Sequence, residues 1–481
     1  MLSYDLSPDR GMPLYEQLYR CLREDIHKGT LRPGEKLPSR RALAAHLGIS
    51  EMTVDHAYGQ LLSEGYIQAE SKRGYYISTA IGGQIVEKSL PTASLPEKVT
   101  PETHWLADFT SNETPAEQFP FTVWSRLIRE MLSMRQEDLL KNPPPGGRSD
   151  LRQAISGHLH SFRGLNVDPE QIIVGAGTEY MYGLLVQLLG TGEPYAVEEP
   201  GYRKAAQVYR SHGARVVPVS MDADGLRVDL LEQSGAAIAH VSPSHHFPTG
   251  RVMSAGRRWQ LLQWAAQGER YIIEDDYDSE FRLAGLPIPA LQSADALGRV
   301  IYMNTFTKTL ASTIRVSYMV LPPALLRRYR ERLAFYSCTV SSIEQATLAA
   351  FISRGYFEKH LNRTRNRCRK KRDLLLSGIK SRISTSQARI AEEDAGLHFL
   401  LTLHTDLPDE TVTQQAARLG LRLRPISAYY HVEQGPAHCF IINYSSIPEE
   451  RIPQVCEAVA ELVEGVCGLD LMQGLPFIKG Q

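Results

Sequence analysis

The sequence predicts an α/β protein whose large body contains a mainly parallel sheet, preceded by a small helical head that ends in a two-stranded hairpin. In the body, short continuous apolar runs alternate with helical patterns, and such runs are typical of parallel strands covered on both faces. Four of these runs are residues 171–174, 238–241, 271–274 and 300–303. The chain has 481 residues, which is more than one hydrophobic core usually serves, so we expect at least two domains.

The composition divides the chain into three segments. Residues 1–78 form the predicted head and residues 104–481 the predicted body. Between them, residues 79–103 hold few large apolar side chains but several prolines and a Gly-Gly pair, which predicts a linker. A predicted long helix around residues 343–380 leads into a smaller α+β subdomain at about residues 380–465.

Bulk composition narrows the class of protein. Hydrophobic residues make up 43% and charged residues 22%, as in ordinary soluble domains, and the formal net charge is −1. Any nucleic-acid contact therefore has to come from a local patch. The six cysteines are scattered, without a CxxC pair or a His at metal spacing, so we expect reduced thiols, a cytoplasmic protein and no metal site. The chain shows no signal-peptide pattern and no apolar run of about 18 residues, so no membrane association is expected.

The head has the spacing of a helix-turn-helix. Apolar residues recur every four positions in residues 14–28, which predicts an amphipathic helix. Ser39 begins a second predicted helix, Gly48 turns the chain, and Ser50 begins a third. A helix, a glycine turn and a helix are the geometry that offers the second of the two helices to the major groove of DNA.

A basic hairpin tip follows the third helix. Residues 65–67 and 75–77 are two short predicted strands, and Lys72, Arg73 and Gly74 lie between them. A basic tip on such a hairpin is typical of a wing that contacts phosphates or the minor groove.

Four strings in the head closely resemble the GntR-type winged helix. They are Leu-Pro-Ser-Arg-Arg-Ala-Leu-Ala at 37–44, Leu-Gly-Ile-Ser at 47–50, Thr-Val at 53–54 and Glu-Gly-Tyr-Ile at 64–67. The resemblance implies that the DNA-binding residues are Ser39, Arg41, Ser50, Thr53, Lys72, Arg73 and Gly74. A winged helix that binds protein instead of DNA is the alternative.

The head departs from that family in its charge. GntR-type domains usually carry Arg directly after the Ser that begins the recognition helix, and here that place is taken by Glu51, with Asp55 one turn later. Residues 1–78 hold ten Lys and Arg against ten Asp and Glu. Because acidic groups repel phosphates, we expect weak DNA binding by one head and stronger binding by two linked heads.

In the body, a lysine motif indicates cofactor chemistry. Lys308 follows a predicted strand, stands among the hydroxyls of Thr305 and Thr307, and precedes Arg315 by seven places. A Schiff base needs an amine that can lose its proton, and hydroxyls with an Arg suit a phosphate group. With Ser317-Tyr318 following, the string resembles the lysine motif of fold-type-I aminotransferases.

Two further motifs fit the same cofactor. Asp275 ends an apolar strand, where a carboxylate can hold a pyridinium proton, and the phenol of Tyr277 can reach the ring hydroxyl. This acidic string alone also fits a metal-binding cluster or a solvated loop, but Lys308, about 33 residues downstream, favours the cofactor. Gly177 and Thr178 stand between a strand and a helix, where backbone N–H groups hold a phosphate.

The string Ser-Pro-Ser-His-His-Phe-Pro-Thr-Gly at 242–250 completes a resemblance that covers the whole chain. The four motifs in this order, behind a GntR-type head, resemble the MocR/GabR group of transcription regulators. The resemblance implies a homodimer and pyridoxal 5'-phosphate (PLP), held by Lys308 as a Schiff base, by Asp275 at the ring nitrogen and by Tyr277 and His245 near the ring hydroxyl. It implies a phosphate site made of Arg315, Thr305, Thr307, Gly177 and Thr178, and an effector pocket lined by Tyr202.

Two positions depart from working aminotransferases. The Arg that grips the substrate carboxylate is replaced by Ile441, and the Tyr that reaches the neighbouring subunit's phosphate is replaced by Asn142. Lys204 and Arg424 are candidate substitutes for that Arg in the effector pocket. The basic run at 363–372 is either a solvated helix face or a surface that follows DNA phosphates.

These observations predict a ligand-responsive transcription regulator that binds double-stranded DNA. Its aminotransferase-like body is expected to sense an amine or amino-acid-like effector, or PLP itself, and to be a sensor rather than an enzyme. A working aminotransferase with a DNA-binding appendage is one alternative. A regulator that has lost its cofactor is the other.

Overall fold

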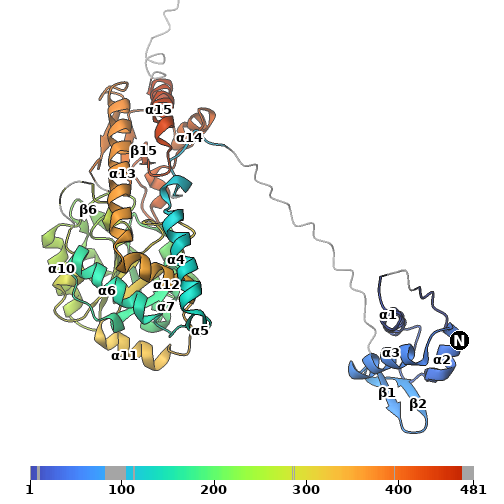
Figure 1. Cartoon of the computed structure of the whole chain (residues 1–481). Coiled ribbons are helices and arrows are strands. Elements are labelled where there is room, and N and C mark those ends of the chain that lie inside the picture. Colours follow the sequence, from blue (N-terminus) through green and yellow to red (C-terminus); the bar gives the residue numbers. More distant parts are fainter. Residues whose placement is uncertain are drawn as a thin grey trace, which may run out of the picture. The chain divides into compact units, whose positions relative to one another are not determined.

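The computed structural model describes residues 2–7, 11–81, 104–111, 114–283, 285, 288–394 and 396–467. The chain separates into two compact units, Met1–Pro101 and Glu102–Gln481, shown in Figure 1. Of the predicted linker, residues 79–81 form a short 3₁₀ helix, η2 (Thr79–Ile81), and the remainder lies outside the described residues.

The first unit is a three-helix head with a hairpin. Its elements are α1 (Leu14–His27), α2 (Arg40–Leu47), α3 (Glu51–Ser63), β1 (Ile67–Glu70) and β2 (Gly74–Ile77). The predicted apolar stripe of α1 is buried against α3 and the hairpin, where Leu22, Leu61 and Ile77 are fully covered. The first strand begins two residues later than predicted, because Gly65 has a φ of 77° and turns the chain before the ladder starts at Ile67.

The second unit is built on an eight-stranded sheet of order β4-β11-β10-β9-β8-β5-β6-β7. The four pairings from β10 through β9, β8 and β5 to β6 are parallel, β11 runs antiparallel to both its neighbours, and β7 runs antiparallel to β6, so the sheet is mainly parallel as predicted. The strands are β4 (Ile172–Gly175), β5 (Tyr195–Glu199), β6 (Val216–Asp222), β7 (Gly225–Leu226), β8 (Ile238–Val241), β9 (Tyr271–Asp275), β10 (Val300–Thr305) and β11 (Ser317–Val320).

Helices pack against this sheet and lie before, between and after its strands in the sequence. They are α4 (Phe121–Met134), α5 (Gln136–Leu139), α6 (Ser149–Arg163), α7 (Thr178–Leu189), α8 (Arg203–Ser211), α9 (Val228–Gln233), α10 (Ala255–Ala266), α11 (Pro323–Arg332), α12 (Ser342–Ser353) and α13 (Tyr356–Lys380). The prediction of a single long helix around residues 343–380 was wrong. Gly355, with a φ of 72°, ends α12 and begins α13, because a left-handed residue cannot continue an α-helix.

A smaller α+β part lies at one end of the second unit, and α13 runs to it from beside α12 (Figure 1). It holds the antiparallel sheet β12-β13-β15 and the helices that cover it. Its elements are β12 (Ala388–Ala391), β13 (His398–Leu403), α14 (Asp409–Arg418), β14 (Leu421–Arg422), β15 (Cys439–Asn443) and α15 (Ile452–Cys467). An early segment joins it: β3 (Ala107–Asp108) pairs in parallel with β14.

None of the six cysteines forms a disulfide. Among the described residues, no helix combines the length and apolar character needed to cross a bilayer.

Candidate functional site

The starts of α2 and α3 are held by serine caps. The Ser39 hydroxyl accepts a hydrogen bond from the Ala42 amide at 3.2 Å, and the Ser50 hydroxyl accepts one from the Thr53 amide at 3.1 Å. Gly48 makes the turn with a φ of 66°. The hydroxyls of Ser50 and Thr53 also lie 2.7 Å apart, so three of the predicted DNA-binding residues build the helix starts themselves.

Ion pairing changes the charge expected on the recognition helix α3. Arg40 forms an ion pair with Asp55, which therefore presents less free negative charge than the sequence predicts. Arg41 is exposed beside it, and so are Glu51 and Met52 at the start of α3. The start of α3 thus presents an exposed acid, Glu51, and the start of α2 an exposed Arg41.

The predicted wing is the hairpin of β1 and β2. Lys72 occupies its tip with a φ of 60°, a conformation that non-glycine residues seldom adopt outside tight turns. Arg73 lies 3.4 Å from Glu70, and the Lys36 ammonium lies 5.8 Å from the centre of the Tyr76 ring. The hairpin therefore presents two cations, Lys72 and Arg73, and a third, Lys36, lies against its second strand.

A pocket of about 220 Å³ lies at the carboxyl ends of the central strands of the large sheet. Asp275 ends β9, Thr305 ends β10, and Thr178 follows β4, so strands far apart in sequence bring their last residues to one edge. The lining residues are Thr178, Glu179, Tyr182, Tyr202, Lys204, Ser242, Phe247, Asp275, Tyr277, Asp278, Thr305, Thr307, Lys308, Arg315, Leu397, His398 and Asn443.

Lys308 stands in the turn after β10 and lines this pocket. Desolvation lowers the pKa of its amine to about 8, while the nearby Asp278 carboxylate opposes the shift. An amine with this pKa is partly neutral near pH 7, which is the condition for nucleophilic attack on an aldehyde.

Asp275 is buried and only half of its carboxylate is satisfied. Its Oδ2 accepts a hydrogen bond from the Tyr182 hydroxyl at 2.6 Å and lies 3.3 Å from His240 Nε2. The Tyr209 hydroxyl in turn lies 2.7 Å from His240 Nδ1, which fixes the imidazole. The other oxygen, Oδ1, is buried without a hydrogen-bond partner among the described residues. A buried acceptor in this state fits a ligand N–H, such as a protonated ring nitrogen.

The predicted phosphate residues gather at the start of α7. Gly177 precedes this helix with a φ of 87°, and a Cβ there would stand 2.2 Å from Arg315 Nη2, so the backbone and the guanidinium approach as only glycine allows. The hydroxyls of Thr305 and Thr307, which line the same pocket, lie 2.8 Å apart. Helix N–H groups, two hydroxyls and an Arg form a cradle suited to a phosphate.

Behind the lysine lies a compact polar cluster. His245 Nδ1 is 2.7 Å from Asp278 and 3.4 Å from the Tyr277 hydroxyl, and its ring lies 5.2 Å from that of His398. Tyr277, Asp278 and His398 line the pocket, whereas His245 stands one layer behind them. Desolvation, with a smaller contribution from His245, lowers the pKa of His398 to about 3, so this imidazole is neutral. Desolvation, then Asp278, raises the pKa of Tyr277, so its phenol stays protonated.

The predicted effector residues divide into two groups. Tyr202 and Lys204 line the pocket, and the Lys204 ammonium lies 3.0 Å from Glu179. Arg424 does not line it: its exposed side chain lies 6.0 Å from the Tyr429 ring centre, so the structure does not support it as a pocket cation.

The two positions that depart from aminotransferases also lie off the pocket lining. Ile441 on β15 is buried in a small apolar cluster with Leu400 and Ile426. Asn142 is exposed between α5 and α6.

Several lining residues were not predicted. Tyr182, Glu179 and Phe247 come from elements already recognised, but His398 and Asn443 come from β13 and β15 of the smaller part. His398 and Asn443 are directly paired across those strands. A polar residue within an apolar strand was the only signal available for either.

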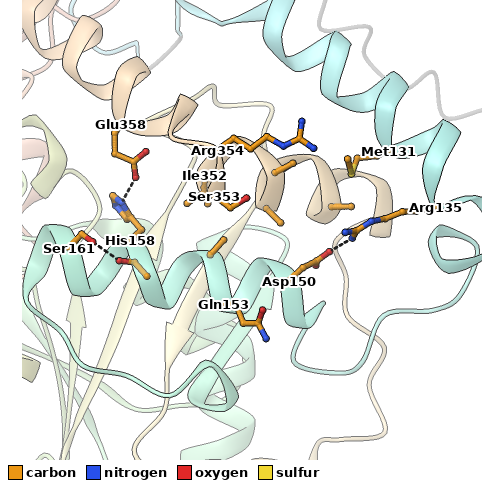
Figure 2. Close-up of a pocket in the computed structure, with 15 residues that line it drawn as sticks. Met131, Arg135, Asp150, Gln153, His158, Ser161, Ile352, Ser353, Arg354 and Glu358 are labelled. Atoms are coloured by element: carbon orange, nitrogen blue, oxygen red, sulfur yellow. Dashed lines mark hydrogen bonds and ion pairs between the residues drawn. The ribbon is translucent and has the colours of Figure 1, made fainter.

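A larger cavity, of about 570 Å³, lies between α4, α6, α12 and the start of α13 (Figure 2). Four alanines and one glycine are among its fifteen lining residues. Its charged side chains are paired: Arg135 with Asp150 at 2.7 Å, Arg354 with Glu130, and Glu358 with His158 at 3.6 Å. None of the residues predicted from the sequence lines this cavity. The smaller pocket, which holds Lys308 and Asp275, is therefore the better candidate for the functional site.

Fold and site together define a helix-turn-helix head joined to a body with the architecture of aminotransferases, and comparison with known proteins agrees. Residues 14–77 match the bacterial regulatory proteins of the gntR family. The body resembles the kynurenine aminotransferase of Pyrococcus horikoshii, with a TM-score of 0.67, 22% identity, and coverage of 76% of this chain and 92% of that one. That likeness shows the fold of PLP-dependent aminotransferases.

Whole-chain relatives give the family. The HTH-type transcriptional regulator YdeL of Bacillus subtilis is 34% identical over 441 residues, covering 92% of this chain and 95% of that protein. The probable rhizopine catabolism regulatory protein MocR of Rhizobium meliloti is 33% identical over 486 residues, covering 98% and 97%. This chain belongs to the MocR-type transcription regulators: a GntR-type DNA-binding helix-turn-helix followed by an aminotransferase-like domain.

Proposed function

We propose that this regulator holds PLP covalently on Lys308 and senses a small amine-type effector at the same pocket. The observation that carries the proposal is the buried, unpartnered Asp275 Oδ1, which lies in one pocket with a partly neutral lysine and a phosphate cradle. When bound, PLP supplies an aldehyde that links to amines and a ring that withdraws electrons.

The predicted site residues have these roles in the proposal. Lys308 would form the covalent link, and Asp275 would hold the proton of the ring nitrogen. Tyr277 would donate to the ring hydroxyl, and His245 would orient Tyr277 from behind. The phosphate would be held by Arg315, Thr305, Thr307, Gly177 and Thr178. Tyr202 and Lys204 would face the effector.

The head is the output of the sensor. We propose that Arg41, Thr53 and the wing residues Lys72, Arg73 and Gly74 touch DNA, while Ser39 and Ser50 position the helices that do so. Two heads carried by a homodimer would raise the effective concentration of the second head. A regulator of transcription works where the DNA is, so we place the protein in the cytoplasm. The functional units are then the head at 1–78, a linker at 79–103 and the sensor body at 104–481.

We propose a sensor rather than an enzyme, because Ile441 and Asn142 replace two groups that aminotransferases use. The retained Lys308, Asp275 and Tyr277 favour the alternative, a working aminotransferase with a DNA-binding appendage. Steady turnover of an amino acid with a keto acid by purified protein would establish that alternative.

The direct test is to add PLP to purified protein, record the visible absorbance, and locate the label by borohydride reduction and mass spectrometry. We expect the label on Lys308 and its loss in Lys308→Ala. Lys359→Ala, an exposed lysine of α13, is the matched control and should keep it. Colourless protein without a reduced adduct would refute the cofactor proposal and leave a DNA-binding head on a body of another function.

A further inference from the structure

The charges of the pocket lining indicate which effectors it admits. Three cations line it: Lys204, Lys308 and Arg315. His398 also lines it but is neutral, because burial lowers its pKa to about 3. The lining carboxylates are Glu179, Asp275 and Asp278.

Glu179 links two of these cations. One oxygen lies 3.0 Å from the Lys204 ammonium, and the other accepts a hydrogen bond from Arg315. If a phosphate binds Arg315, Glu179 still has Lys204 as its partner. The positive charge of Lys204 is therefore neutralised by Glu179 whether or not a phosphate is bound.

Under the proposed function, no cation of the lining then remains for an effector carboxylate. Lys308 is used by the covalent link, Arg315 by the phosphate, and Lys204 by Glu179. The position where aminotransferases place their carboxylate Arg is the buried, apolar Ile441. Bringing a carboxylate into such a site without a partner costs free energy, because its hydration is lost and not replaced.

The rest of the lining favours the opposite charge and an apolar body. With Lys308 used by the covalent link, two lining cations face three carboxylates, and Asp278 is the carboxylate in excess, although it also hydrogen-bonds His245. Phe247, Tyr202 and Leu397 supply apolar wall. The cavity of about 220 Å³ is below the roughly 300–1,000 Å³ of drug-sized ligand sites, so with a cofactor in place only a small molecule fits.

We infer that the effector is a small primary amine without a carboxylate, and that the Glu179–Lys204 pair excludes α-amino acids. This inference rests on the proposed function and adds the chemical class of ligand. The amine would replace Lys308 on the cofactor, while Asp278 and the aromatic wall hold the remainder of the molecule.

Matched pairs of probes test it on the full-length, PLP-loaded protein. Tyramine against tyrosine, and putrescine against ornithine, differ by one carboxylate. We expect each amine to shift the visible absorbance band at a concentration at least about tenfold lower than the matching amino acid requires. The carboxylate of the amino acid would lack a charged hydrogen-bond partner, and the loss of one such bond lowers affinity by about that factor.

A charge-releasing variant tests the residues. Glu179→Gln frees Lys204 and should lower the concentration of tyrosine or ornithine needed for the shift by about tenfold. The double variant with Lys204→Gln should remove that gain. Glu232→Gln, the same change at an exposed position on α9, is the control and should respond as the parent does.

The outcomes separate the two proposals. A coloured protein that responds equally to amine and amino acid, or only to the amino acid, overturns the inference and leaves the cofactor proposal standing. A coloured protein that none of the four probes shifts also overturns the inference. Protein that never takes up PLP overturns both.

Discussion

In the head, the caps of α2 and α3 are made by side chains bonded to amides three residues away, whereas in the pocket the Tyr182 hydroxyl reaches Asp275 across 93 residues of sequence. His398 reaches the carbonyl of Pro248 across 150 residues. The first site is local, so its damage should act through the stability of one small unit. The second is assembled from distant strands, so its damage should act through binding while the fold persists.

The largest expected effect comes from a variant that destabilises the head and leaves the second unit intact. Leu61→Ala opens a cavity in the core of the head, where this side chain is fully buried, and should cost the head about 2–5 kcal/mol. DNA binding should be lost while PLP uptake is unchanged, measured by urea unfolding, DNA titration and absorbance on one preparation. A parallel loss of PLP uptake would show that the units depend on each other.

The next effect concerns only the pocket. Because burial lowers the pKa of Lys308 to about 8, its neutral fraction should rise with pH, from about 1% at pH 6 to about 90% at pH 9. The rate of PLP capture should rise roughly hundredfold over this range and level off above pH 8. Asp278→Asn removes the carboxylate that opposes the shift, so its profile should move to lower pH; an unmoved profile would contradict this electrostatic account.

A pair of glycine variants sharpens the comparison further. Gly177→Ala and Gly190→Ala both place a side chain at positive φ with an extended ψ, at 87° and 166° for Gly177 and at 91° and 175° for Gly190, which costs about 1–3 kcal/mol in either case. Only at Gly177 does the new Cβ meet Arg315, whereas nothing lies within 4 Å at Gly190. PLP affinity should fall about tenfold in Gly177→Ala alone. Equal losses in the two variants would mean that backbone strain, not the phosphate cradle, controls binding.

The smallest effect returns to the head. Ser50→Ala removes the cap of α3 and should lower the free energy of unfolding of the head by about 1 kcal/mol. This change in free energy can be measured by chemical denaturation, monitored with a spectroscopic probe placed in the head. Ser63→Ala, whose hydroxyl donates to the carbonyl of Gln60 at the far end of the same helix, should change stability less.

The sequence predicted what depends on local patterns. The helix starts at Ser39 and Ser50, the mainly parallel sheet and the strand-end positions of Asp275 and Lys308 all follow from periodicity, capping and turn residues. The break at Gly355 was missed because one glycine in a strongly helical pattern does not by itself end a helix. His398 and the Glu179–Lys204 pair were missed for another reason: the first depends on how two sheets meet and the second on how α7 packs beside α8, and no short string encodes either.

The pairing of β3 with β14 has a mechanical consequence. The chain that comes from the head enters the second unit at Ala107–Asp108, and there it is hydrogen-bonded to Leu421–Arg422, with Arg422 3.1 Å from the Asp108 carboxylate. The same smaller part supplies His398 and Asn443 to the pocket wall. If the smaller part rotated when the pocket is occupied, Ala107–Asp108, the first strand of the second unit, would therefore move with it.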